Sequence, residues 1–282
     1  PKGVMVSHDN LLHNLGIIAQ SFGLTPDTPS VSWLPLYHDM GLIGNILQPI
    51  YSGFSVTLMS PVAFLQKPLR WLQAITRYQA TITGAPNFAY DLCVNKINAE
   101  QQATLDLSSL QVAFCGAEPI RAATLARFTA SFADCGFRPG TFYPCYGMAE
   151  ATVFITGKTK KAPLKIQYLI SSALEQNQIV TSIEQAGAQS VVSCGEIGVG
   201  DKLAIVDPHS FTRCSTDQIG EIWLSGPSVA QGYWQQPVAT AQAFQAYLAD
   251  TGEGPFLRTG DLGFLQENEL FVTGRLKDLF IL

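Results

Sequence analysis

Short apolar runs alternate with segments of helical periodicity through the first half of the chain, and this alternation limits the possible folds more than any other feature. The apolar runs lie at 31–35, 53–61, 81–86, 109–116 and 141–147, and each ends in glycine or proline. Strands that alternate with helices are typical of a mostly parallel sheet covered on both faces. The sequence therefore predicts an α/β core, a mostly parallel sheet layered with helices.

Helical signals occur between these runs. Ser7 is suited to accept a free first-turn N–H group of a helix that continues to about Phe22. Pro68 suits the start of a second helix, and a third helix is predicted from Arg121 to Asp134.

The pattern changes in the second half of the chain. Residues 202–207, 220–226 and 262–274 have the composition of strands, and 266–268 is the expected turn of a hairpin. We therefore expect the α/β core to be followed by a smaller β-rich, barrel-like subdomain that covers residues 194–274.

Composition excludes several classes of protein. The net charge is −5, without a long basic block, so neither nucleic acid nor an anionic membrane is an expected partner. No run approaches the roughly 18 consecutive apolar residues of a spanning helix, and no signal peptide is visible. The 6 cysteines are scattered without a C-x-x-C pair, which favours reduced thiols in a cytoplasmic protein over a zinc site.

Three of the predicted strands end in glycine-bearing turns: 84–86 (GAP), 116–119 (GAEP) and 146–150 (YGMAE). In open α/β sheets, ligands bind beyond the carboxyl ends of the strands. The three turns are therefore expected to line one pocket. No P-loop is present, and GEIGVG at 195–200 has the wrong spacing for a dinucleotide turn, so we interpret it as a connection between strands.

Five segments, from PKGV at the start through GAEP, YGMAE and RTGD to GRLKD at 274–278, occur in the order found in the adenylate-forming ligases, which the chain resembles over essentially its whole length. That superfamily includes acyl-CoA synthetases, nonribosomal-peptide adenylation domains and fatty acyl-AMP ligases. The sequences of residues 33–44, 114–121, 146–152 and 254–264 are similar to the corresponding motifs of the fatty acyl-AMP ligases.

The resemblance also implies a division of the chain. Residues 1–193 would form the adenylate-forming core, with a family-type insertion at about 156–193, and 275–282 would be a hinge to a C-terminal domain. The other interpretation of 156–193 is a long surface loop. The chain opens on PKGV and closes within an apolar stretch, so we expect a fragment that lacks the N-terminal part and the C-terminal domain, and that by itself has little adenylation activity.

The reaction implied by the resemblance is attack of a carboxylate on the α-phosphorus of ATP, which gives acyl-AMP and pyrophosphate. Glu150 is the expected ligand of Mg²⁺, which prefers hard oxygen ligands. Tyr146 would stack on adenine, Asp261 would accept both ribose hydroxyls, and Arg275 would hold ribose or phosphate oxygens. The residues expected to bind ATP or AMP are Gly116, Ala117, Glu118, Tyr146, Gly147, Met148, Asp261 and Arg275.

On the acyl side, the matching histidine of the family lies beside the carboxylate pocket, which assigns His38 to substrate positioning. The alternative is a purely structural role, in which His38 forms a hydrogen bond with its neighbour Asp39. Together with Glu150 and His38, Lys277 completes the expected catalytic set, because it matches the hinge position of the family. The residues expected to line the acyl pocket are His38, Asp39, Met40, Gly41, Asn87 and Phe88.

The favoured function is activation of a long-chain fatty acid and its transfer to the phosphopantetheine arm of an acyl carrier protein, within polyketide or lipopeptide assembly. A fatty acyl-CoA synthetase is the nearest alternative. A non-catalytic module that docks a carrier protein through lysines at 158–165 is an alternative of another class.

Overall fold

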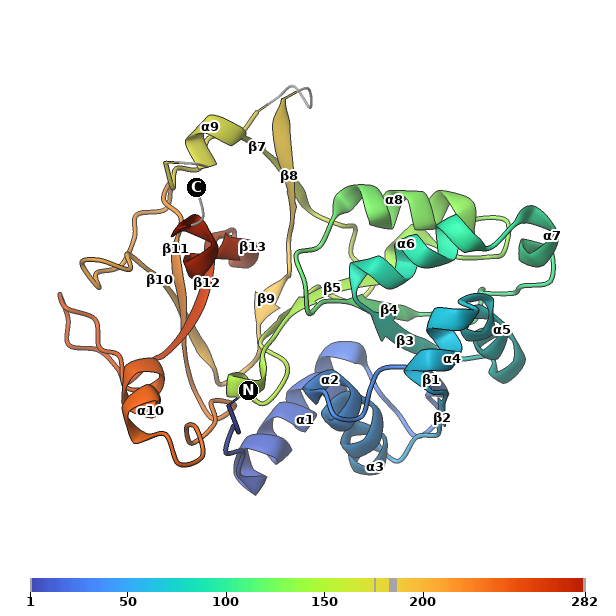
Figure 1. The fold of residues 1–282 in the computed structure, drawn as a ribbon, viewed down its shortest axis with the longest axis horizontal. Helices are drawn as coiled ribbons and strands as arrows, with labels where there is room; N and C mark the ends of the chain where they lie inside the picture. Colours follow the sequence, from blue (N-terminus) through green and yellow to red (C-terminus); the bar gives the residue numbers. More distant parts are fainter. Residues whose placement is uncertain (1, 175, 183–186, 281–282) are drawn as a thin grey trace. The chain divides into compact units, whose positions relative to one another are not determined.

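The computed structural model describes residues 2–174, 176–182 and 187–280 (Figure 1). Its contacts divide the chain into two compact units. One unit, the α/β unit, contains Leu15–Cys145 and Lys158–Leu164, and the other, the β unit, contains the chain up to Asn14, Tyr146–Gly157 and the chain from Lys165 onward. The division of domains at residue 193 stays a sequence-based prediction.

Five parallel strands form the sheet of the α/β unit, in the order β2-β1-β3-β4-β5 (Figure 1). Their bounds are β1 Ser30–Ser32, β2 Val56–Leu58, β3 Ile82–Ala85, β4 Val112–Cys115 and β5 Phe142–Tyr146. Each of the five predicted apolar runs thus overlaps a strand, and the expectation of a mostly parallel sheet layered with helices is confirmed.

Helices connect these strands, and α6 and α8 lie side by side (Figure 1), joined by the Asp91 carboxylate, which accepts a hydrogen bond from the Thr124 hydroxyl at 2.9 Å and pairs with Arg127. The helical segments up to residue 141 are α1 His8–Phe22, α2 Asp39–Leu42, the π-helix η1 Ile43–Leu47, α3 Gln48–Ser52, α4 Pro61–Gln66, α5 Leu69–Tyr78, α6 Asn87–Lys96, α7 Ala99–Gln102, α8 Ala122–Ser131 and the 3₁₀ turn η2 Pro139–Thr141.

The predicted helix starts are confirmed at two positions. The Ser7 hydroxyl accepts the Asn10 N–H group at 3.1 Å, as an N-cap does, and Pro68 directly precedes α5. The predicted run 53–61 is too long, because Ser60 caps α4 by accepting the Ala63 N–H group at 3.2 Å. Pro61 is therefore the first residue of a helix rather than the last residue of a strand.

Large aromatic side chains fill the core of the α/β unit. Trp33 stacks on Phe64 with ring centroids 4.0 Å apart, and the buried Trp71 indole donates to the Thr83 hydroxyl at 2.9 Å. Gly84 lies on β3 against Phe114, whose ring atoms would be 2.2 Å from any added Cβ. This glycine is needed for close packing within the sheet.

The β unit contains a four-stranded antiparallel sheet in the order β10-β11-β12-β13 (Figure 1). The strands are β10 Lys202–Val206, β11 Gly220–Ser225, β12 Leu257–Gln266 and β13 Glu269–Arg275. The predicted hairpin is confirmed, since Glu267 and Asn268 form its two-residue turn with positive φ angles of 51° and 65°.

The described part of the segment at 156–193 contains regular structure beside irregular stretches. It forms strands β7 Ile166–Ile170 and β8 Ala188–Val192, which pair antiparallel as a separate two-stranded sheet, and the helix α9 Ser171–Leu174. The remaining elements of the β unit are the 3₁₀ turn η3 Ala149–Ala151, the antiparallel pair β6 Thr156–Gly157 and β9 Glu196–Ile197, the helix α10 Pro237–Phe244 and the 3₁₀ turn η4 Leu276–Phe280.

Within the described part of the chain, no helix has both the length and the apolar character that crossing a membrane requires.

Candidate active site

Three predicted nucleotide-binding residues of the β unit are joined by one hydrogen bond and one ion pair. The Tyr146 hydroxyl donates to Asp261 Oδ2 at 2.7 Å, and Arg275 Nε lies 3.2 Å from Asp261 Oδ1. Asp261 and Arg275 are directly opposite each other in the β12–β13 ladder, so strand pairing places their side chains together. The sequence predicted all three residues, and the structure brings them together.

Burial is the largest influence on the ionisation of Tyr146 and Asp261. Burial raises the pKa of the Asp261 carboxyl above its usual value, while the Tyr146 hydrogen bond and the Arg275 charge act in the opposite direction. Burial and the Asp261 carboxylate raise the pKa of Tyr146 well above its usual value, so this hydroxyl keeps its proton and remains a donor. The Tyr146 hydroxyl therefore helps to keep the Asp261 carboxyl ionised.

Glu150, the predicted metal ligand, lies on η3 and is held by a residue that the sequence did not single out. The Tyr233 hydroxyl donates to Glu150 Oε1 at 2.7 Å, and the Glu150 carbonyl accepts the Ala230 N–H group at 2.9 Å. Burial and the Glu150 carboxylate raise the pKa of Tyr233. The side chain and backbone of Glu150 are therefore both anchored to the segment around Tyr233.

The backbone around Glu150 folds back tightly on itself. A Cβ at Gly147 would lie 1.7 Å from the Val153 carbonyl oxygen, so only glycine fits there. Thr152 has φ 67° and ψ −69°, and the Val153 N–H group donates to the Ala151 carbonyl at 2.8 Å across it. This is a γ-turn of the strained kind, and strained backbone of this type is concentrated at functional sites.

Glu150 is suited to bind Mg²⁺ as a single carboxylate ligand. Among the described residues, no group of three or more His, Cys, Asp or Glu side chains is arranged to hold a metal ion. Mg²⁺ usually binds one or two carboxylates together with substrate phosphates and water, rather than a cage of protein ligands. A carboxylate has about four acceptor positions, so Glu150 keeps acceptor capacity beside its bond from Tyr233.

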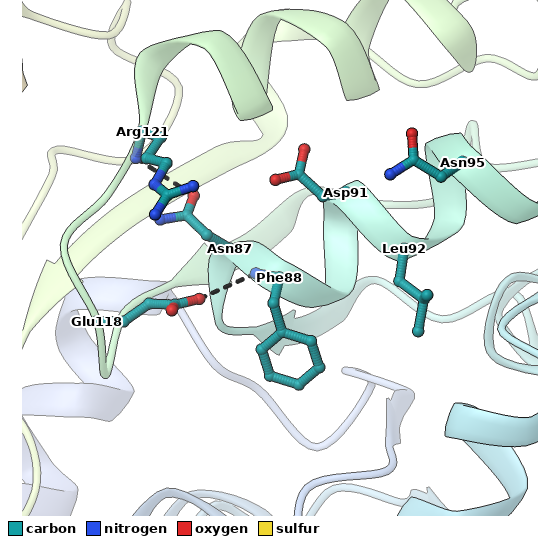
Figure 2. Close-up of a pocket in the computed structure, with 7 residues that line it drawn as sticks. All are labelled: Asn87, Phe88, Asp91, Leu92, Asn95, Glu118 and Arg121. Atoms are coloured by element: carbon teal, nitrogen blue, oxygen red, sulfur yellow. Dashed lines mark hydrogen bonds between the residues drawn. The ribbon is translucent and has the colours of Figure 1, made fainter.

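In the α/β unit, Gly116, Ala117 and Glu118 follow β4 as predicted. A Cβ at Gly116 would lie 3.0 Å from the Cys145 carbonyl oxygen, so this backbone is packed closely against β5. Ala117 has a positive φ of 67°, which is uncommon for a residue with a side chain. The Glu118 carboxylate accepts the Phe88 N–H group at 2.9 Å, as Figure 2 shows, and thereby ties this turn to the start of α6.

A cavity of about 320 Å³ lies beside α6 (Figure 2). Asn87 orders its wall, because the side-chain amide donates to the Pro119 carbonyl and its oxygen accepts the Arg121 N–H group at 3.3 Å. The cavity thus contains two predicted acyl-pocket residues and one predicted nucleotide residue, together with side chains that the sequence did not suggest. Its lining residues are Asn87, Phe88, Asp91, Leu92, Asn95, Glu118 and Arg121.

The remaining predicted acyl residues lie at the start of α2. His38 is the N-cap of α2, because its Nδ1 accepts the Met40 N–H group at 3.3 Å, and the same Nδ1 lies 2.6 Å from Asp39 Oδ1. A Cβ at Gly41 would lie 2.0 Å from the Pro35 carbonyl oxygen. His38 therefore has a structural contact at the start of α2, and its role in substrate positioning stays a prediction, as does the alternative of a hydrogen bond to Asp39.

Two further predicted residues are placed by the structure. Met148 is partly buried and packs into the cluster of buried side chains that contains Tyr233. Lys277 is exposed on η4, and its charge lies close enough to Asp261 to lower the pKa of that carboxyl slightly.

The lysines at 158–165 are largely engaged within the fold. Lys158 is buried and donates to the Ala162 carbonyl, and Lys160 donates to the Phe22 carbonyl at 3.0 Å. Lys165 pairs with Glu269 at 3.0 Å and with Glu267 at 3.3 Å. Lys158, Lys160 and Lys165 therefore make contacts within the fold, and docking of an acidic carrier protein on these lysines stays an alternative interpretation.

Sequence reasoning missed Tyr233, Glu221 and Arg258. The buried Glu221 pairs with the partly exposed Arg258, at 2.8 Å. The available signal was an acidic residue inside the otherwise apolar strand GEIWLSG, since a charge in such a strand needs a partner. Tyr233 carried no distinctive local signal.

A mostly parallel sheet whose strands end in glycine-bearing turns is typical of α/β proteins that bind ligands at this edge of the sheet. The sequence profile of the AMP-binding enzyme family matches residues 1–234, so the chain belongs to that family.

Curated relatives match the whole chain. A medium-chain fatty acid–[acyl-carrier-protein] ligase of Moorena producens, JamA, is 47% identical over 285 residues, which cover 100% of this chain and 48% of that protein. A putative fatty-acid–CoA ligase of Mycobacterium leprae is 40% identical and is covered to 50% of its length. The chain spans about half the length of the curated relatives it matches.

Solved structures agree with this relationship. A fatty acid AMP ligase from Legionella pneumophila has a TM-score of 0.95 and 50% sequence identity over 100% of this chain and 49% of that one. A fatty acyl-adenylate ligase from L. pneumophila, solved in complex with acyl adenylate and pyrophosphate, matches with the same values. The resemblance to the fatty acyl-AMP ligases is thereby confirmed.

Proposed function

We propose that the whole protein activates a fatty acid with ATP, forming acyl-adenylate and pyrophosphate, and then transfers the acyl group to the phosphopantetheine thiol of an acyl carrier protein. The Tyr146–Asp261–Arg275 chain carries this proposal, because it offers an aromatic ring, an ordered carboxylate and a guanidinium to one nucleotide. The relatives named as acyl-carrier-protein ligases support the choice of acceptor.

In the adenylation step, the fatty acid carboxylate attacks the α-phosphorus of ATP and pyrophosphate leaves with the electrons of the broken P–O bond. Tyr146 stacks on adenine, and Asp261 accepts hydrogen bonds from the ribose hydroxyls. Arg275 holds ribose or phosphate oxygens, while the backbone of residues 116–118 lines the base. Positioning and charge stabilisation supply most of the catalysis in such transfers.

Glu150 would hold Mg²⁺, which when bound neutralises charge on the phosphate oxygens. Tyr233 keeps the Glu150 carboxylate oriented. The glycine at position 147 would let the backbone approach the α-phosphate closely. Lys277 would act at the hinge between adenylation and acyl transfer.

The substrate is proposed to be a fatty acid whose chain lies in an apolar pocket. Each buried CH₂ group contributes roughly 0.8 kcal/mol to binding. His38, Asp39, Met40, Gly41, Asn87 and Phe88 are the proposed lining. The names of two relatives specify medium-chain acids, which favours a shorter acyl chain than the sequence alone suggested.

The cytoplasm is the proposed compartment. All 6 cysteines are free thiols in the structure, and unpaired cysteines are typical of reducing compartments.

A fatty acyl-CoA synthetase is the second candidate, and the M. leprae relative named as a putative fatty-acid–CoA ligase favours it. The two functions share the adenylation step and differ in the acceptor thiol. The β7–β8 sheet would hinder use of free CoA in the first function and would be neutral in the second.

The deciding experiment supplies the whole protein with Mg-ATP and radiolabelled dodecanoate, once with CoA and once with a phosphopantetheinylated carrier protein. Acyl-AMP that persists with CoA but is consumed by the carrier protein is the expected result. Rapid formation of acyl-CoA would establish the synthetase instead. Absence of acyl-AMP under both conditions would refute adenylation and favour a non-catalytic role.

A further inference from the structure

Glu221 is a buried carboxylate that the proposed mechanism does not use. Glu221 lies on β11 and is only 1% exposed. Its neighbours on the strand, Ile222, Trp223 and Leu224, are buried as well. Burying an ionised carboxylate is expensive unless it is paired and hydrogen-bonded. Its presence in the strand therefore requires either full pairing or a function.

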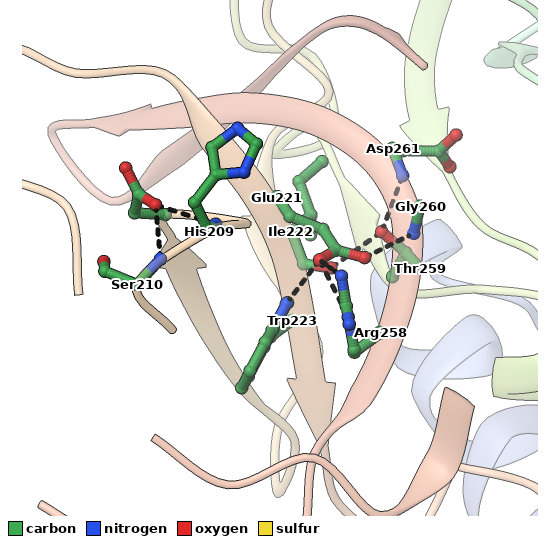
Figure 3. A network of polar contacts seen from close by, with 10 residues as sticks. His209, Ser210, Glu221, Ile222, Trp223, Arg258, Thr259, Gly260 and Asp261 are labelled. Atoms are coloured by element: carbon green, nitrogen blue, oxygen red, sulfur yellow. Dashed lines mark hydrogen bonds and ion pairs between the residues drawn. The ribbon is translucent and has the colours of Figure 1, made fainter. Parts of the chain in front are cut away.

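Four donor contacts converge on the Glu221 carboxylate, as Figure 3 shows. Glu221 Oε2 accepts from Trp223 Nε1 at 2.9 Å and from Arg258, whose Nε lies at 3.0 Å and Nη2 at 2.8 Å. The guanidinium carbon of Arg258 is also 4.9 Å from the centroid of the Phe211 ring, a cation–π distance. Oε1 faces the other way and accepts the backbone N–H group of Gly260 at 3.1 Å.

The bond to Gly260 lies inside an irregularity of the sheet. Glu221 pairs with Leu262 and Trp223 pairs with Arg258, so Ile222 alone on β11 faces Thr259, Gly260 and Asp261 on β12. The extra residues form a bulge, and bulges next to active sites re-aim side chains. Gly260 has a positive φ of 71°, so the chain turns sharply just before Asp261.

Side chains replace the ladder hydrogen bonds that the bulge removes. The Thr259 hydroxyl donates to the Ile222 carbonyl at 2.7 Å and accepts the Asp261 N–H group at 3.1 Å. Glu221 supplies the acceptor for the Gly260 N–H group between them. The bulge that carries Asp261 is therefore held from one side by Thr259 and from the other by Glu221 and its partner Arg258.

We propose that Glu221 is a positioning residue for nucleotide recognition: through Arg258 and the Gly260 N–H group it shapes the bulge that aims the Asp261 carboxylate at the ribose hydroxyls. This inference rests on the proposed role of Asp261 in holding the ribose. In this role Glu221 acts on Asp261 indirectly, through the Arg258 side chain and the backbone N–H group of Gly260.

The test compares binding of Mg-ATP with binding of Mg-2′,3′-dideoxy-ATP to the whole protein by titration calorimetry. The dideoxy analogue lacks both hydroxyls that Asp261 would accept. The wild type should bind ATP about tenfold to a hundredfold more tightly than the analogue, as expected for hydrogen bonds to a charged group. Glu221→Gln should reduce this preference to less than about threefold by weakening ATP binding, and should leave affinity for the analogue nearly unchanged.

Two further variants keep the test decisive. Glu253→Gln removes the same charge from an exposed ion pair with Arg213 in the β unit, and should retain the wild-type preference. Arg258→Lys keeps the positive charge but loses the two-point contact with Glu221. It should show an intermediate preference, and it decides the question if Glu221→Gln fails to fold.

Equal losses for ATP and for the dideoxy analogue would overturn the proposal, since they would indicate a general structural role for Glu221. An unchanged preference in Glu221→Gln and Arg258→Lys would also overturn it, as would a wild type that does not discriminate between the two nucleotides. A wild type that discriminates but forms no acyl-AMP would instead refute only the proposed function. The two failures are thereby distinguishable.

Discussion

At the scale of single residues, the candidate site depends on two tyrosine hydroxyls, each of which holds one carboxylate. Tyr146 donates to Asp261 and Tyr233 donates to Glu150, both at 2.7 Å. Both acceptors have proposed roles with the nucleotide or its metal. Removing either hydroxyl therefore tests one proposed role without removing the carboxylate itself.

Tyr146→Phe should shift the pH dependence of ATP use. The Tyr146 hydrogen bond lowers the pKa of the Asp261 carboxyl, which burial raises, so its loss should raise this pKa further. Less Asp261 is then ionised at a given acidic pH, and the acidic limb of the kcat/KM profile for ATP should move to higher pH. Tyr143→Phe, which alters a buried tyrosine of the α/β unit, is the control. An acidic limb that stays in place would contradict the prediction.

Tyr233→Phe should weaken the response to magnesium. Without the hydroxyl, the Glu150 carboxylate loses its orienting bond, which contributes on the order of 1 kcal/mol. The Mg²⁺ concentration needed for half-maximal pyrophosphate release should rise about threefold to tenfold. The exposed Tyr247→Phe should leave this requirement unchanged. A lower maximal rate at an unaltered magnesium requirement would show that Tyr233 serves another purpose.

At the scale of elements, the turn after β5 is shaped by its neighbour in the chain. Gly147 lies against the Val153 carbonyl, and Thr152 closes a γ-turn that returns the backbone toward it. The turn therefore has room for a backbone but not for a side chain. The geometry of this turn depends on η3 together with the residues just before and just after it.

Gly147→Ala should disrupt this element. The added methyl group would lie 1.7 Å from the Val153 oxygen, so the backbone must move. Overpacking of this kind costs about 1–3 kcal/mol, which denaturant unfolding of the whole protein would detect together with loss of ATP binding. Gly44→Ala is the matched control, because a Cβ there meets nothing within 4 Å. Equal stability of the two variants would contradict the geometry.

At the scale of the whole molecule, the proposed reaction requires one protein to bind an adenosine and an acyl chain together. An acyl-sulfamoyl-adenosine with a dodecanoyl chain carries both parts, whereas AMP and dodecanoate carry one each. At a hundredfold excess over its Kd, such a ligand should stabilise the whole protein by about 2.7 kcal/mol. At equal concentrations, AMP and dodecanoate should each raise the Tm much less, and an equal effect of all three ligands would argue against a composite site.

The sequence by itself determined the features that depend on neighbouring residues. The Ser7 cap, the helix after Pro68, the turn at Glu267 and Asn268, and the alternation that specifies a parallel sheet were all predicted and are all present. Capping, periodicity and turn chemistry act over a few residues, so a local stretch of sequence contains the information. The strand limits near Pro61 were wrong, because the Ser60 cap made a helix competitive with the strand.

Only the tertiary structure decided which distant residues share a contact. Tyr146 and Asp261 are 115 positions apart, and Tyr233 and Glu150 are 83 apart. Their meeting depends on strand order, on register and on the bulge opposite Ile222, and no local pattern contains these. The family resemblance predicted Asp261, Arg275 and Glu150, but it did not predict the residues that hold them in place. Tyr233, Glu221 and Arg258 emerged only from the folded chain, because a buried charge or hydroxyl is satisfied by whichever partner the packing brings within hydrogen-bonding distance.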